Sequence, residues 1–548
     1  MQRSILIGLI VALLLGVFVR LWQLGRIPPG LHGDEAMIGY TTLSLLQTGK
    51  DLLGQTNYLA LSDPNAGGTY PPLRSYILMP FVKLMGLSVF VNRLPPALFG
   101  IIAIFLVFRI CQHVLKDDNV ALVAAFLMAL NPWAIHISRQ GLLESEALTL
   151  VLAGVVLFFE GAKKPFLYII SGCLFALSLF AYDAPRLFLP LFIIVLAWFR
   201  WGEVKRAVRY TALGGGVFAL FFALFLFQLL FRGEVQEYTR SGILHSSSVV
   251  NSVVRGRTLT NAPLWASSLV HNKVTEGAKV ALTHYVSIFS INWFFVNGYG
   301  NLQEAVGNHG QYYVFELPLF FLGWFYLFRK HIKTAWFLLG WMLLGALPGG
   351  LSDGNYAYRS MLLLPVPLMV SSFGLLSLVS YTRKMNTTLR LWASISAAVI
   401  VCVSVGLYLF TYFFDYPVYA SENWAKQQND AIRFAVSHKD KYQYVFIDGG
   451  LAWTATYGFL YTVDTATYQQ TVKRPVTVGD GEYVKFGNIF FRNLPDSIRL
   501  LPSAADYFPK GSLIITIGPD DVFGEDVPLE RFLAPGGSHA VYKAIEVR

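Results

Sequence analysis

Long apolar runs separated by short polar loops fill residues 1–412 of the chain. The first run extends from about Ser4 to Trp22, and others lie near residues 94–113, 119–137, 145–161, 166–182, 187–200, 210–231, 312–328, 334–350, 360–380 and 391–412. Each is long enough to cross the roughly 30 Å hydrocarbon core of a bilayer as a helix, which predicts about eleven transmembrane helices. The first run has no small-residue cleavage site, so we expect a retained helix.

Two shorter helical patterns lie in the loop after the first run, residues 23–93. One covers residues 36–46 and follows Asp34, a residue type that often caps a helix N-terminus. The other covers residues 73–83 and begins after two prolines. Both are too short to span a bilayer, so we expect amphipathic helices that lie at its surface.

The pattern changes after residue 412, where shorter runs of mixed periodicity replace the long apolar ones. Helical spacing covers residues 422–436 and 451–462, and strand-like runs occupy residues 444–448, 487–491, 512–516 and 539–543. The long loop 232–311 is polar and has no evident regular structure. We expect a transmembrane domain over 1–412, with external loops at 23–93 and 232–311, and a small external α/β domain over 413–548.

Composition excludes a soluble globular protein. Of the 548 residues, 55% are hydrophobic and 14% charged, and 43 are Phe, 28 Tyr and 12 Trp. A soluble domain has too little interior for so many apolar side chains. The formal net charge of +10 is explained by basic cytoplasmic loops, so we expect no nucleic-acid partner. The three cysteines lie far apart and form neither a disulfide framework nor a zinc pattern.

The distribution of basic residues predicts the orientation of the chain. If the N-terminus is cytoplasmic, the inner loops carry Lys116, Lys163, Lys164, Arg200, Lys205, Arg206, Arg209, Arg329, Lys330, Lys333, Arg383, Lys384 and Arg390. The short outer loops carry only Arg139, Arg186 and Arg359. This asymmetry follows the positive-inside rule, and with about eleven spans it places the C-terminal domain outside the cytoplasm in a cell membrane.

Two adjacent carboxylates, Asp34 and Glu35, mark the strongest candidate for a reaction centre. They follow the first apolar run and a turn rich in proline and glycine, at residues 27–33. Ionisable groups at a membrane surface are costly to desolvate, and they commonly belong to a substrate or ion site.

Four short motifs carry a resemblance to a known family. They are Gly33-Asp34-Glu35-Ala36, Tyr70-Pro71-Pro72-Leu73, Asn92-Arg93-Leu94-Pro95 and His136-Ile137-Ser138-Arg139-Gln140-Gly141-Leu142-Leu143-Glu144-Ser145. In this order and topology the chain resembles the polyprenyl-phosphate-dependent membrane glycosyltransferases of the GT-C type, in the branch of protein O-mannosyltransferase and the aminoarabinose transferases. The resemblance covers roughly residues 1–200 and continues loosely to the last span. The Trp-Trp-Asp signature of the oligosaccharyltransferase branch is absent, which argues against en bloc transfer to asparagine.

The resemblance implies a fold, a reaction and a set of site residues. It implies a GT-C transmembrane domain, a polyprenyl-phosphate sugar donor, and an acceptor hydroxyl on a protein, a lipid or a glycan. The family's external carboxylate corresponds to Asp34 or Glu35. Its Ser-Arg-x-x-x-Leu-Asp pattern corresponds to Ser138, Arg139 and Leu143, with Glu144 in place of the aspartate. We expect substrate contacts from Tyr70, Arg74, Arg93, Glu144 and Asp183.

The chemistry of such a transfer assigns roles to the charged residues. The departing lipid phosphate is already a good anion, so it needs cationic stabilisation, which we expect from Arg139 and Arg359. The acceptor hydroxyl needs a base, which we expect to be Asp34, with Glu35 orienting the site or serving as the alternative base. Attack from the opposite face would invert the anomeric centre. A divalent cation, Mg or Mn, could bridge a carboxylate to the phosphate.

Simpler alternatives stand beside each assignment. Asp34 could only cap its helix, Arg139 and Arg359 could be interfacial anchors, and Asp183 could be a turn residue. For the whole chain, the rival hypothesis is a transporter or lipid-carrier flippase. Transporters commonly place polar groups near the bilayer midplane within repeated halves. The sequence shows no internal repeat and most of the candidate charges lie at span ends, which favours the enzyme.

Overall fold

The computed structural model describes residues 2–64, 68–231, 243–353, 356–383 and 386–548. The chain divides into two compact units. The first comprises residues 1–22, 96–138 and 143–409, and we call it the helical unit. The second comprises residues 23–95, 139–142 and 410–548, and we call it the α/β unit. The first loop, which the sequence grouped with the transmembrane domain, therefore packs with the C-terminal segment.

The predicted spans coincide with helices. These are α1 (Arg3–Leu21), α4 (Val89–Leu115), α5 (Asp118–Leu130) with α6 (Pro132–Ser138), α7 (Glu144–Glu160), α8 (Leu167–Ser178), α9 (Ala184–Phe199), α11 (Val208–Phe231), α16 (Glu316–Lys330), α17 (Ile332–Gly350), α19 (Pro365–Thr382) and α20 (Thr387–Phe410). Within the described ranges, six helices are long and apolar enough to cross a membrane, or seven if the α5–α6 pair, bent by 55°, is one span. The prediction of a polytopic helical membrane protein is confirmed.

Small residues allow close helix packing inside the helical unit. Helix α8 packs against both α7 and α11. At the crossing with α11, a Cβ atom added to Gly172 would lie 2.1 Å from the backbone oxygen of Gly214. Only glycine permits this approach, and close backbone approach is a main source of helix association within lipid.

The long loop 232–311 contains helices that the sequence did not predict. They are α13 (Ser247–Thr258), α14 (Leu264–Val270) and α15 (Lys273–Ile288). The start of α15 carries a capping box, in which the Asn272 side chain accepts from the N–H of Thr275 and the Thr275 hydroxyl bonds back to the N–H of Asn272. The expectation of a loop without regular structure is wrong for these segments, and the described part of this loop is largely helical.

The first loop contributes two helices and a short hairpin to the α/β unit. Helix α2 (Gly33–Thr48) packs against α3 (Leu73–Met85), α23 and α24, and the hairpin consists of β1 (Leu61–Asp63) and β2 (Gly68–Tyr70). Helices α23 (Leu451–Tyr461) and α24 (Thr465–Lys473) come from the C-terminal segment. Because most residues of α2 are buried by these neighbours, α2 is an internal helix. Its position relative to the membrane surface stays a prediction.

The C-terminal segment folds around a mixed sheet. Its strands are β3 (Tyr444–Asp448), β4 (Val476–Val478), β5 (Gly481–Phe486), β6 (Ile489–Arg492), β7 (Ser512–Ile517), β8 (Glu530–Leu533) and β9 (Ala540–Glu546), in the order β4-β5-β6-β3-β7-β9-β8. Helices α22 (Lys426–His438) and α25 (Asp496–Arg499) accompany them. Strand β3 is parallel to both β6 and β7, and the other pairings are antiparallel. The predicted α/β character of this segment is confirmed.

Candidate active site

A histidine, and not Asp34, caps helix α2. Nδ1 of His32 accepts a hydrogen bond from the backbone N–H of Asp34 at 3.3 Å, and a Glu35 carboxylate oxygen accepts the N–H of His32 at 3.3 Å. Nδ1 also lies 3.7 Å from an Asp34 carboxylate oxygen. The alternative that Asp34 only caps the helix is therefore wrong. Its side chain is 50% exposed.

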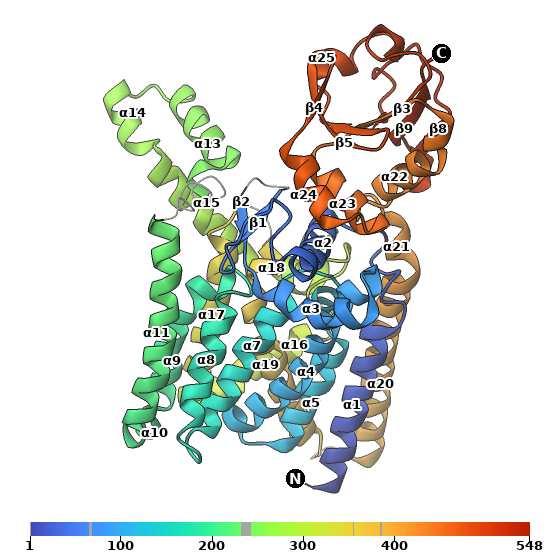
Figure 1. Ribbon diagram of the computed structural model, residues 1–548. Coiled ribbons are helices and arrows are strands. Elements are labelled where there is room, and N and C mark those ends of the chain that lie inside the picture. Colours follow the sequence, from blue (N-terminus) through green and yellow to red (C-terminus); the bar gives the residue numbers. More distant parts are fainter. Residues whose placement is uncertain (1, 65–67, 232–242, 354–355, 384–385) are drawn as a thin grey trace. The chain divides into compact units, whose positions relative to one another are not determined.

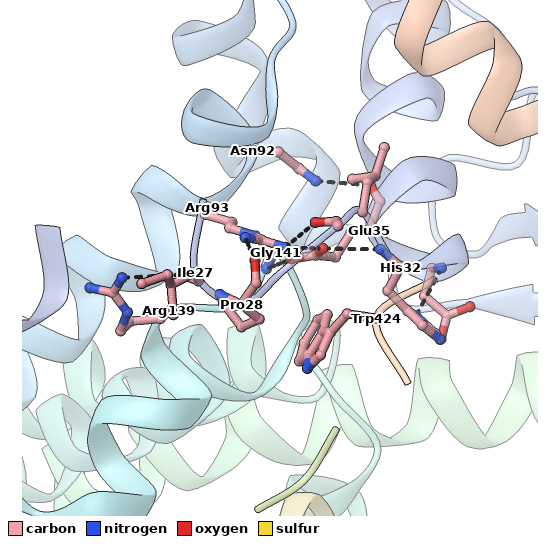
Figure 2. Close-up of polar contacts among 12 residues, drawn as sticks. Ile27, Pro28, His32, Glu35, Asn92, Arg93, Arg139, Gly141 and Trp424 are labelled. Atoms are coloured by element: carbon pink, nitrogen blue, oxygen red, sulfur yellow. Dashed lines mark hydrogen bonds and ion pairs between the residues drawn. The ribbon is translucent and has the colours of Figure 1, made fainter. Parts of the chain in front are cut away.

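Glu35 is locked in a buried ion pair (Figure 2). Its two carboxylate oxygens accept from Nε and Nη2 of Arg93 at 2.8 and 2.7 Å, and one also accepts the backbone N–H of Gly141 at 2.7 Å. Both side chains are 0% exposed. Burial alone would raise the pKa of the Glu35 carboxyl, but the Arg93 guanidinium and the Gly141 N–H together hold that pKa below its ordinary value. Glu35 is thus an ionised structural group and a poor proton acceptor.

Arg93 uses all of its donors inside the protein. Besides its bonds to Glu35, Nη1 donates to the backbone oxygen of Pro28 at 2.7 Å, and Nη2 donates to that of Gly30 at 2.9 Å. The guanidinium also lies 5.7 Å from the centre of the Trp424 ring. Nη1 also donates to the backbone oxygen of Leu24 at 3.5 Å, so each of the five N–H groups of the guanidinium has an acceptor in the protein. The predicted substrate role of Arg93 is corrected to a structural one: it holds the turn that leads to Asp34.

Tyr70 and Arg74 are also buried within the α/β unit. The Tyr70 hydroxyl lies 3.2 Å from the Ser75 hydroxyl, and burial raises its pKa. A guanidinium nitrogen of Arg74 donates to the backbone oxygen of Asn92, whose side-chain amide donates in turn to the backbone oxygen of Glu35 at 2.8 Å. Both side chains are buried. Arg74 supports the backbone of Asn92 and, through it, that of Glu35, whereas the substrate contacts expected of Tyr70 and Arg74 stay predictions.

Arg139 is enclosed by aromatic rings of the α/β unit. Its guanidinium donates to the backbone oxygen of Ile27 at 3.1 Å, and it lies 5.6 and 5.0 Å from the ring centres of Tyr412 and Phe413. The residue is 0% exposed. This contradicts the alternative of an anchor that extends to water, and it leaves no open face for the donor phosphate. Arg139 instead fixes the segment 139–142, which includes Gly141, against the turn.

In the helical unit, Arg359 follows a backbone segment held by a buried acid that the sequence did not identify. Glu304 accepts the backbone N–H groups of Ala357 and Tyr358 at 2.9 and 3.2 Å. Burial raises the pKa of Glu304 to about 7, although these bonds and the nearby Arg359 guanidinium act in the opposite direction. Arg359 itself is half-buried. Across the described ranges its guanidinium has no ion pair to a carboxylate.

The other two predicted acids of the helical unit differ in their surroundings. Glu144 opens α7, and within the described residues its buried Oε2 has no hydrogen-bond partner. The substrate contact expected of Glu144 stays a prediction. Asp183 forms an ion pair with Arg186 at 2.5 Å in the turn before α9. Its local pairing agrees with the alternative of a turn residue.

Comparison with known proteins gives a family match and a fold match. Residues 69–227 match the model of the dolichyl-phosphate-mannose-protein mannosyltransferase family. ArnT from Cupriavidus metallidurans, bound to undecaprenyl phosphate, superposes with a TM-score of 0.52 at 11% identity over 99% of this chain and 98% of that one. The oligosaccharyltransferase AglB from Archaeoglobus fulgidus, in complex with an inhibitory peptide and a dolichol-phosphate, gives 0.50 at 13% identity, over 85% and 64%. A comparison with curated sequences finds no match.

The chain has the GT-C fold. The resemblance predicted from four short motifs is thereby confirmed at the level of the fold, and the apolar helices agree with a multi-pass membrane protein. The chain spans 64% of the length of AglB, so the activity of that larger protein is not transferred whole to this one.

Several residues around the candidate positions of the two units carry no recognisable signal in the sequence. His32 is a rare cap, and Glu304 stands in a loop without a motif. Trp424 contacts His32 and Arg93, and Tyr412 and Phe413 contact Arg139, in each case from a distant position in the chain. Such partners are brought together only by the fold. Gly141 is the exception, because it lies inside the fourth motif, but its role is a backbone N–H that sequence patterns do not reveal.

A divalent cation at this site would bridge Asp34 or Glu35 to the donor phosphate. Over the described ranges, no group of three or more His, Cys, Asp or Glu side chains is placed to hold a metal ion. Both oxygens of Glu35 accept hydrogen bonds from Arg93 or Gly141. Dependence on such a cation stays a prediction.

Glu304 predicts a specific pH dependence of stability. Its folded pKa is about 7 and its ordinary value is 4.5, so between these values the folded chain keeps a proton that the unfolded chain has released. Stability must therefore fall as pH rises through this window. We expect Glu304→Gln to flatten the decline in melting temperature between pH 5 and 7. Glu203→Gln, at a half-exposed helix position, is the control, and a Glu304→Gln curve parallel to the wild type would contradict this.

Proposed function

We propose that this GT-C protein transfers a sugar from a polyprenyl phosphate to an acceptor hydroxyl, with inversion, and that Asp34 is the base. One observation carries the assignment: of the two adjacent carboxylates, Glu35 is buried and neutralised by Arg93, while Asp34 is half-exposed and lines a pocket. The buried pair fixes the backbone from which Asp34 projects. A base held on a rigid support and open to a ligand is what a hydroxyl acceptor requires.

The proposed reaction needs one bond to form and one to break. The acceptor oxygen attacks the anomeric carbon while the bond from that carbon to the phosphate oxygen breaks. Asp34 takes the hydroxyl proton, and the polyprenyl phosphate leaves with the bonding electrons as an anion. Because the nucleophile enters opposite to the departing phosphate, the anomeric configuration inverts. The leaving group is a stable anion, so no general acid is required.

We assign the phosphate contact to Arg359 in place of the enclosed Arg139. A half-buried guanidinium without a carboxylate partner can form paired hydrogen bonds to a phosphate. Arg359→Met is expected to lower kcat/KM for the donor about 10- to 100-fold, because a hydrogen bond to a charged group is lost. Arg255→Met removes an exposed arginine of α13 and should have no effect. Equal kcat/KM values for the two variants would remove Arg359 from the donor site.

The orientation of the reaction follows from charge. The positive-inside pattern supports a cytoplasmic N-terminus and an extracytoplasmic C-terminal segment, and we propose that transfer takes place on the extracytoplasmic face of the membrane. The acceptor is a hydroxyl of a protein, a lipid or a glycan in the cell envelope.

Transfer is distinguished from lipid flipping by following the sugar and the carrier separately. The full chain is reconstituted in liposomes that contain a polyprenyl-phosphate sugar labelled on the sugar, with a heat-treated envelope extract as acceptor. The proposed enzyme moves label covalently onto the acceptor and leaves free polyprenyl phosphate. Movement of intact, labelled carrier between leaflets without release of polyprenyl phosphate would instead indicate a flippase.

A further inference from the structure

A pocket of about 430 Å³ lies within the α/β unit beside Asp34. One side is formed by the start of α2, from His32 to Asp34, and the rest comes from the C-terminal segment. Its volume falls in the range of roughly 300–1,000 Å³ that small-molecule sites occupy. Nothing in the proposed mechanism so far accounts for the part contributed by the C-terminal segment.

The pocket occupies the position in the sheet where α/β domains commonly bind ligands. Strand β3 has two parallel neighbours, β6 on one side and β7 on the other. The chain therefore continues from β3 to one side of the sheet and later returns to place β7 on its other side, so the strand order reverses at β3. Ala452 and Trp453, in the first turn of α23 after β3, line the pocket, as does Tyr542, which pairs with the last residue of β7. Ligands of open α/β sheets bind at such a switch point, outside the carboxyl ends of the strands.

The charge of the lining excludes an anionic occupant. Two lining residues, Asp34 and Glu422, are acids, and the lining contains no lysine or arginine. A lipid phosphate or a nucleotide would meet repulsion here and would find no cation to bind. The occupant is therefore neutral or cationic, which separates this pocket from the site of the donor phosphate.

The remaining side chains suit a molecule with many hydroxyl groups. Trp453 and Tyr542 present aromatic rings with centres 5.0 Å apart at an angle of 87°. Gln427 and Gln428 add amides. Nε2 of Gln427 is held by the Ser421 hydroxyl and the Leu533 backbone oxygen, so the amide orientation is fixed. Within the described residues its Oε1 is buried without a hydrogen-bond partner, and such an oxygen needs a donor.

We propose that this pocket binds the acceptor and that the acceptor is a neutral or amino-substituted carbohydrate. The aromatic rings would pack against the apolar face of a sugar ring, and the amides with Glu422 would bond its hydroxyls. Asp34, at the edge of the same pocket, would accept the proton of the hydroxyl that is glycosylated. A peptide is less suited, because the pocket lies at strand ends and offers no open strand edge for backbone pairing. This inference rests on the proposed function, since it takes Asp34 as the base.

The test measures carbohydrate binding to the full chain in lipid nanodiscs by saturation-transfer NMR. The probes are chitobiose, mannobiose and maltose, with the capped tripeptide Ala-Ser-Ala as the alternative acceptor type. At least one disaccharide is expected to bind and the peptide is not. Trp453→Ala should weaken binding about 5- to 30-fold, and the milder Gln428→Ala about 2- to 10-fold. Tyr461→Ala, on the same helix but outside the pocket, is the matched control.

Each result decides between acceptor classes. Binding of the peptide alone, or of none of the probes, would overturn the proposal, and so would equal weakening by Tyr461→Ala and Trp453→Ala. In transfer assays the two pocket variants should raise the KM for the acceptor and leave that for the donor unchanged. If Asp34→Asn is inactive while the pocket variants keep the wild-type acceptor KM, this inference fails and the proposed function stands. An active Asp34→Asn would contradict the proposed function itself.

Discussion

Asp34→Asn is expected to reduce sugar transfer by about 10²- to 10⁴-fold, the usual contribution of a positioned base. The amide has nearly the same shape as the carboxylate but cannot accept the proton of the acceptor hydroxyl. Folding should be unaffected, because His32 caps α2 and Glu35 forms the buried pair, whereas the Asp34 side chain is half-exposed. The measurement is the initial rate of transfer from a polyprenyl-phosphate sugar, compared between the variant and the wild type at saturating donor.

The matched control for this variant is Asp496→Asn. Its carboxylate also lies in the α/β unit, is 83% exposed, and does not line the pocket. It should keep the wild-type rate and melting temperature. If Asp34→Asn also kept the wild-type rate, Asp34 would not be the base.

The second large effect concerns stability. Arg93→Ala leaves the Glu35 carboxylate buried without its partner, and it also removes the donors that hold the turn at Pro28 and Gly30. Breaking a buried ion pair from one side costs about 3–5 kcal/mol. We expect a loss of this size in the free energy of unfolding, measured by denaturant titration of the protein in detergent.

A pair of further variants separates charge from packing. Glu35→Met combined with Arg93→Met removes both charges, so it should cost less than Arg93→Ala, because no buried charge is left alone. Arg433→Ala breaks an exposed pair with Asp430 on α22 and should change stability by less than about 1 kcal/mol. If the double variant were less stable than Arg93→Ala, the stability lost in Arg93→Ala would not come from the unpaired charge of Glu35.

The sequence was sufficient for the class and the span positions because both depend on local pattern. Runs of apolar residues long enough to cross a bilayer fold as helices wherever they lie in the chain. Asp34 and Arg359 were selected as candidates for the same reason, since charged residues at the ends of such runs are costly to desolvate; their roles stay predictions. The strands β3, β6, β7 and β9 also carry apolar runs that indicate strands.

Contacts between residues far apart in the chain could not be predicted from the sequence pattern. Glu35 and Asp34 are adjacent and chemically alike, and only the packing of Arg93, 58 residues later, buries Glu35 in an ion pair. The proposed role of Asp34 as the base depends on this difference. The same limit explains Arg139, whose enclosure depends on Tyr412 and Phe413. The prediction that Asp34 caps α2 was wrong because aspartate is a common cap and histidine a rare one. Strands β4 and β8 have only three and four residues, too few for an apolar pattern to indicate a strand.

The central claim is that the sugar comes from a polyprenyl phosphate. Its most direct test gives the purified chain, in nanodiscs, a set of tritiated sugars in two forms, linked to polyprenyl phosphate or to a nucleotide. A heat-treated envelope extract supplies the acceptor, and the label on the acceptor is counted together with the free polyprenyl phosphate released. We predict that at least one polyprenyl-phosphate sugar gives equal amounts of labelled acceptor and free polyprenyl phosphate. No nucleotide sugar should give labelled acceptor. Label that comes only from a nucleotide sugar would contradict the account.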